Sequence, residues 1–248
     1  MEVRRVQQVG RSTFLISLPK DWVEESGLKR GNLVVITTEE DGSIRVIPSG
    51  SGGGGKPREW VIDADSCDQK DLIARLLVGW YIAGHESVCI KSRRELAAEH
   101  LREVRGSTQR LSGLGILEQT FSRMSLHTFV DVGKFSFHAL LRRLHAIIMS
   151  MNGSVIEALS KWRLSLVNEV LGREEEVDRL CLLLMRQLMT AVRTKTIRQA
   201  IGIPSCFRIF MGFSIVKAME EMSDYYVRIV EEVQWMMSRN VTPNRKVL

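Results

Sequence analysis

The sequence is poor in cysteine. Its four cysteines, at positions 67, 89, 181 and 206, lie far apart, and no two of them form a Cys-x-x-Cys pair. Structural zinc sites and disulfide frameworks are built from closely spaced cysteines. The sequence therefore predicts neither, and it suits a reducing compartment.

Long apolar runs are also missing. The longest apolar stretches, Leu76–Ala83 and Leu180–Met185, are too short to cross a bilayer. The first residues, MEVRRVQQVGRS, lack the apolar core of a signal peptide. We therefore expect a cytoplasmic protein that is not inserted in a membrane.

Signatures of catalysis and of nucleotide binding are absent as well. Residues 59–130 contain no GxGxxG or GxxxxGKS/T spacing, and the sequence has no HExxH segment. Di-iron helical bundles use Glu-x-x-His pairs, but Val177 and Ser223 stand three residues after Glu174 and Glu220. Since no candidate nucleophile or oxyanion loop is found either, we expect that the protein is not an enzyme.

What is present indicates a globular chain with several parts. Apolar residues make up 44% of the 248 positions and charged residues 26%. The net charge of +6 favours an anionic partner. The segment SGSGGGGKP has the composition of a flexible linker. We therefore divide the chain into residues 1–48, a linker at 49–57, a segment at 58–130 and a helical region at 131–240.

Residues 1–48 predict a small unit rich in β-structure. We expect a short helix at Lys20–Ser26 and strands at Val3–Val9, Ser12–Ser17, Leu33–Thr38 and Ser43–Pro48. A unit of this size cannot bury much apolar surface alone, and dimerisation is the usual remedy.

The run VQQVGRSTFLISLPKDWVEESGLKRGNLVVI resembles the AbrB/SpoVT (MazE-like) swapped-hairpin domain. The resemblance implies an interlaced homodimer that commonly binds DNA. The basic residues available for phosphate contacts are Arg4, Arg5, Arg11, Lys20, Lys29 and Arg30. Alternatively, these residues only solubilise a domain whose role is to dimerise.

The segment at 58–130 predicts a small α/β subdomain. We expect strands at Trp60–Ile62, Ser87–Lys91, Ile116–Phe121 and Ser125–Phe129, and helices at Asp68–Ala83 and Arg93–Arg105. The sequence does not indicate what this segment does.

From Lys134 onward the apolar residues recur at helical spacing. One helix is expected to end near Trp162, a second to span Ser165–Thr194 and a third Cys206–Arg239. Pro204 separates the last two, because proline cannot sit inside a helix. Short connections favour an antiparallel three-helix bundle. The predicted fold is thus multidomain α+β: a β swapped-hairpin domain, an α/β segment and an all-α bundle.

Carboxylates on the last two helices have an unusual distribution. Glu220, Asp224 and Glu231 fall within about 40° of one another on a helical wheel, as on many solvated helix faces. Glu174 and Asp178, by contrast, interrupt an apolar stripe, where an uncompensated charge is costly. A bound cation would compensate them, and hard cations prefer oxygen ligands.

These helices carry a second resemblance. EEMSDYYVRIVE resembles the ERIADHAVNIAE-type segment of PhoU proteins, and REEEVDRLCLLLMRQL resembles the acidic helix that precedes it. The resemblance implies that Glu174, Asp178, Glu220 and Asp224 bind Mg, Mn, Zn or Fe ions, and that Glu231 matches the trailing Glu. One three-helix repeat is found, whereas a typical PhoU protein has two.

PhoU proteins regulate phosphate uptake through transporters and signalling. A chain that combines these two domains resembles fused regulators known mostly from archaea. The two resemblances imply a dimeric, DNA-binding transcriptional regulator of phosphate homeostasis with a metal-binding helical domain. The alternative is an adaptor that binds a phosphate transporter or a signalling protein, with the N-terminal unit only dimerising.

Overall fold

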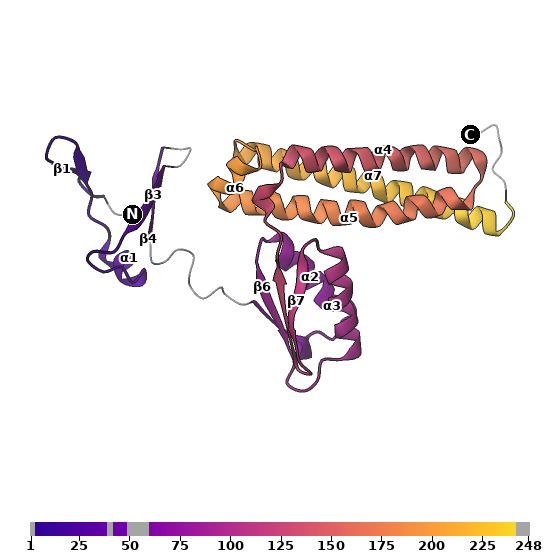
Figure 1. Ribbon diagram of the computed structural model, residues 1–248, viewed down its shortest axis with the longest axis horizontal. Helices are drawn as coiled ribbons and strands as arrows, with labels where there is room; N and C mark the ends of the chain where they lie inside the picture. Colours follow the sequence, from indigo (N-terminus) through magenta and orange to yellow (C-terminus); the bar gives the residue numbers. More distant parts are fainter. Residues whose placement is uncertain (1–2, 39–41, 49–59, 242–248) are drawn as a thin grey trace. The chain divides into compact units, whose positions relative to one another are not determined.

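A computed structural model of the protein describes residues 3–38, 42–48 and 60–241. The chain divides into two compact units, Met1–Arg58 and Glu59–Leu248. The predicted linker at 49–57 lies outside the described residues. The hairpins, the α/β segment and the helical bundle that the sequence predicts are all found (Figure 1).

The first unit consists of two hairpins and a short helix. Strands β1 (Gln7–Val9) and β2 (Thr13–Leu15) pair antiparallel, and so do β3 (Val34–Thr38) and β4 (Ile44–Pro48). Helix α1 (Lys20–Glu25) lies between the hairpins. Gly10 and Gly27 have φ values of +70° and +65°, which a glycine adopts without steric cost, at the first turn and just after the helix.

In the first unit, every side chain whose burial is described is exposed or half-buried. Phe14, Leu33 and Ile36 are 66%, 76% and 62% exposed. The described part of the unit therefore has apolar side chains but no core of its own.

The second unit begins with a four-stranded sheet in the order β5-β6-β8-β7. Strands β5 (Trp60–Asp63) and β6 (Ser87–Lys91) are parallel, while β7 (Leu114–Gln119) and β8 (Arg123–Thr128) continue the sheet antiparallel. Two helices, α2 (Leu72–Ile82) and α3 (Ala98–Arg110), pack together on the sheet (Figure 1).

Both helices begin later than the sequence predicts, and the structure gives the reasons. Asp71 has φ +59°, outside the right-handed helical region, so α2 begins only at Leu72. The Asp65 carboxylate accepts hydrogen bonds from Ser92 Oγ (2.7 Å) and Arg93 N (2.8 Å). These bonds hold the segment before α3 as a loop.

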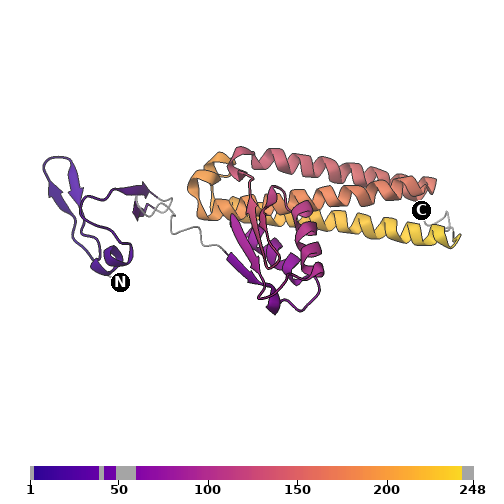
Figure 2. The same ribbon diagram turned by 60° about the horizontal axis from the view of Figure 1, so that its bottom comes forward.

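The rest of the second unit is the predicted bundle. Helices α4 (Phe137–Lys161), α5 (Leu164–Arg193) and α7 (Cys206–Ser238) lie side by side (Figures 1 and 2). A further helix, α6 (Lys195–Ala200), was not predicted and lies in the connection before α7. No helix of the described chain combines the length and the apolar character needed to cross a membrane.

Arg186 of α5 joins the bundle to the α/β segment. It is only 4% exposed, and its Nη1 donates to the backbone oxygens of Tyr81 (2.6 Å) and His85 (2.9 Å). Its guanidinium also lies 4.8 Å from the centre of the Tyr81 ring. These contacts fix the end of α2 against α5.

Replacing this residue should loosen the two parts of the unit. We expect Arg186→Leu to lower the free energy of unfolding by about 3 kcal/mol, because two buried carbonyl groups lose a charged donor. Denaturant titration followed by circular dichroism measures the loss. The control is Arg193→Leu, which removes an exposed bond to the Ala83 oxygen (2.9 Å) and should cost about 1 kcal/mol or less. Equal losses would contradict the role of Arg186.

Candidate functional site

Helices α5 and α7 bring four of the predicted carboxylates into one region. Burial, together with the negative charges of Glu220, Asp178 and Asp224, raises the pKa of the Cys181 thiol to about 12. Burial also raises the pKa of Glu174, with further contributions from the charges of Asp178 and Asp224. Two carboxylates from each helix thus act on the same part of the bundle.

Two of these four carboxylates are neutralised by basic side chains. Asp178 Oδ2 accepts a hydrogen bond from Arg110 Nη2 of α3 at 2.9 Å. Glu220 Oε2 accepts one from Lys217 Nζ, three residues earlier on α7. This bond is the main reason why the pKa of Lys217 is raised.

Glu174 and Asp224 have no such partner within the described part of the chain, and both side chains are partly exposed. Glu174 and Asp178 line a groove of about 440 Å3 together with Arg110 and Arg179. The donor chemistry, carboxylate oxygens from two helices, suits a hard cation. No group of three or more acidic, histidine or cysteine side chains in the described residues is close enough together to hold a metal ion.

Glu231 lies apart from this group. It is exposed on α7, seven residues beyond Asp224, which corresponds to about 10 Å along the helix. Its charge is not among those that raise the pKa of Glu174 or of Cys181.

The six predicted DNA-contacting residues are all exposed in the first unit. Arg11 lies in the turn between β1 and β2, and Lys29 and Arg30 follow α1. Lys20 begins α1 and forms an exposed ion pair with Glu24 at 3.6 Å. Arg4 and Arg5 precede β1. The described structure thus places six basic side chains at the surface of a unit without a core.

Two residues of the carboxylate region were not predicted from the sequence. Lys217 could have been found, because a lysine three residues before Glu220 lies beside it on a helix. Arg110 could not, because it comes from the α/β segment, 68 residues before Asp178. Only the fold brings that pair together.

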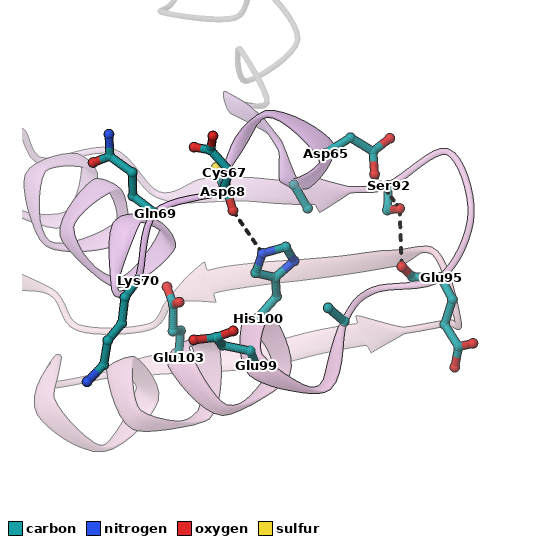
Figure 3. Close-up of a pocket in the computed structure, with 12 residues that line it drawn as sticks. Asp65, Cys67, Asp68, Gln69, Lys70, Ser92, Glu95, Glu99, His100 and Glu103 are labelled. Carbon is teal, nitrogen blue, oxygen red and sulfur yellow. Dashed lines mark hydrogen bonds between the residues drawn. The ribbon is translucent and has the colours of Figure 1, made fainter.

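The α/β segment has an acidic pocket of its own, of about 370 Å3 (Figure 3). Glu103 accepts hydrogen bonds from the backbone N–H groups of Asp71 and Ala74, both at 3.1 Å, and so caps the start of α2. His100 Nε2 donates to the Cys67 oxygen at 3.1 Å. Together with Asp65, these side chains hold the loops at the ends of β5 and β6.

Two protein families match parts of the chain. The family described as antidote-toxin recognition MazE, bacterial antitoxin, matches residues 7–54, and the PhoU domain family matches residues 141–233. No curated protein and no solved structure matched the chain. The two family matches confirm both resemblances found in the sequence, and the second covers all five candidate metal-binding residues.

The raised pKa of Glu174 makes a prediction about pH. The Glu174 carboxyl group binds its proton more tightly in the folded protein than in the unfolded chain. Its contribution to the free energy of unfolding is therefore fully present below the usual pKa of 4.5, and it is lost as the pH rises through the raised pKa. We expect the neutral Glu174→Gln to stabilise the bundle at pH 7 by less than about 1 kcal/mol, since solvent screens this site.

The gain should disappear at pH 4, where the wild-type carboxyl group is itself protonated. Thermal unfolding at both pH values, followed by helical circular dichroism, measures it. Glu175→Gln, at an exposed neighbouring position, is the control. A loss of stability at pH 7, or the same gain at both pH values, would contradict the prediction.

Proposed function

Because this chain carries a MazE-type antitoxin domain and a PhoU domain, we propose that it is a dimeric, DNA-binding regulator of phosphate homeostasis. Both families are regulatory and non-catalytic, so the proposal assigns no reaction to the chain. In it, the N-terminal unit pairs two chains and binds DNA, and the bundle binds a metal ion.

The missing core of the N-terminal unit is the main support for pairing. Apolar residues of all four strands are exposed, among them Val9, Phe14, Val35 and Ile44. Apolar surface on this scale in so small a unit needs a partner to cover it. A second copy of the chain supplies an identical set of hairpins.

The basic side chains of the same unit support DNA binding. Pairing two units doubles the six exposed basic residues to twelve, and the net charge of the chain is already +6. Contacts of this kind bind phosphates regardless of sequence, and their strength falls steeply with salt because counterions are released from the DNA.

The bundle supports metal binding through the chemistry of its donors. Glu174, Asp178, Glu220 and Asp224 would hold the ion, and a bound divalent or trivalent metal supplies positive charge to this acidic region. In the structure, Arg110 and Lys217 supply part of that charge instead. Release of Asp178 from Arg110 would loosen α3 from α5, and this links the metal to the α/β segment.

For the DNA-binding role, we predict that Arg5→Ala with Arg11→Ala weakens binding at least about 10-fold. The slope of log K against log salt should fall by roughly 2 to 4, because a dimer loses up to four phosphate contacts. Fluorescence anisotropy with a labelled duplex at several salt concentrations measures both quantities.

The control for this experiment is Arg94→Ala with Arg163→Ala, which removes the same charge from exposed positions outside the N-terminal unit. It should bind like the wild type. If a stable dimer binds no duplex even at low salt, the DNA-binding role is wrong, and the adaptor that binds a transporter or signalling protein becomes the better proposal.

For the metal-binding role, Glu220→Gln with Asp224→Asn should remove most of the bound metal from the purified protein, whereas Glu175→Gln should retain it. Arg110→Gln should bind metal several-fold more tightly than the wild type, because the ion no longer competes with a guanidinium for Asp178. Metal analysis and calorimetric titration with Mg²⁺, Mn²⁺, Zn²⁺ and Fe²⁺ test this. Equal metal content in all variants would rule out the carboxylate site.

A further inference from the structure

Helix α7 has a second apolar stripe besides the one that faces the bundle core. The core-facing residues include Ile209, Val216, Val230 and Val233, which are all buried. The second stripe, which we call the outer seam, consists of Met211, Ile215, Ala218, Met222, Tyr225 and Ile229. All six side chains are exposed. Among the five larger ones, the exposed fraction ranges from 38% for Ile229 to 59% for Tyr225.

The spacing of the outer seam is that of a coiled coil. Its residues follow one another at intervals of four, three, four, three and four, which is the alternation of a heptad repeat. Helices with this repeat pair with another helix along the seam. Within its own bundle α7 packs against α4 and α5 through its buried face, so the seam remains open in the described structure.

The charges beside the seam fit a second copy of the same helix. No seam position from 211 to 229 is charged, so the seam offers nothing to an acidic or basic partner. Glu221 and Arg228 lie along one edge, each directly before a seam residue. In an antiparallel pair related by a two-fold axis, Glu221 of one copy lies near Arg228 of the other.

We propose that the outer seam is an interface at which α7 pairs antiparallel with α7 of a second copy of this chain. The two-fold axis passes between Met222 and Tyr225, so Met222 packs on Tyr225 of the second copy and Ile229 on Ala218. Six side chains on one helix cover less than the roughly 800 Å2 per partner of a standard interface. The seam therefore closes between chains that are already held together.

Pairing of the N-terminal units, which is part of the proposed function, holds two chains together. The inference rests on the proposed function only for this pairing. Two chains joined at one end present their bundles to each other at high effective concentration. The pairing of the N-terminal units and the pairing of the α7 helices both have two-fold symmetry, so one dimer of the chain can contain both.

Cross-linking of the full chain tests the seam. Tyr225→Cys near the axis is compared with Asn168→Cys, an exposed position on α5, both in a Cys206→Ser background. The remaining native cysteines are buried. With a short bismaleimide, we expect the seam cysteine to link two chains at least about 10-fold faster than the control. Because Tyr225 is 59% exposed, its replacement should not disturb the fold.

A charge exchange provides the matched control. Glu221→Arg should slow cross-linking through Tyr225→Cys several-fold, because like charges then meet across the axis. Adding Arg228→Glu to the same chain should restore the rate. Failure of the double variant to recover would overturn the antiparallel arrangement.

The mass of the uncross-linked protein in solution, from light scattering, separates the two proposals. A dimer whose two cysteine variants cross-link at the same slow rate overturns the seam but leaves the N-terminal pairing intact. A monomer that does not cross-link overturns both.

Discussion

Helix α5 packs against α4 and α7 on one side and against α2 and α3 on the other, so neighbours surround much of it. Polar residues on the enclosed faces of such a helix cannot reach solvent, and they must find partners in the neighbouring elements. Gln187 Nε2 donates to the backbone oxygens of Val132 (2.9 Å) and Phe135 (2.6 Å), just before α4 begins. Arg186 and Asp178 reach α2 and α3 in the same way. The α/β segment and the bundle are therefore one structure, organised around one helix.

This arrangement explains why the carboxylate region is not an ordinary solvated helix face. Its four carboxylates lie on α5 and α7, but the guanidinium that neutralises Asp178 comes from the α/β segment. A ligand that binds there competes with a contact between two parts of the unit. Under the proposed function, a cation that displaced Arg110 from Asp178 would change how firmly α3 is held.

Local patterns made most of the elements predictable. Apolar periodicity and Pro204 indicated the three long helices, whose ends agree with the structure to within a few residues. The same patterns could not give the parallel pairing of β5 with β6, because strand order depends on contacts distant in sequence. The late start of α2 depends on the backbone conformation of Asp71, and that of α3 on a carboxylate 28 residues before Arg93. In the candidate site, helical spacing made the four carboxylates predictable from the sequence. The contact of Arg110 with Asp178 could be found only in the folded structure.

The first unit has one further consequence, which concerns the amount of protein in the cell. Under the proposed pairing, this domain without a core of its own folds when two copies meet, so its folded fraction would depend on the concentration of the chain. At low abundance, the population of folded pairs falls with the square of the chain concentration, while the second unit, with two apolar cores, stays folded. Synthesis and dilution of the chain would then act directly on its N-terminal activity, in a manner that is separate from any signal sensed by the bundle.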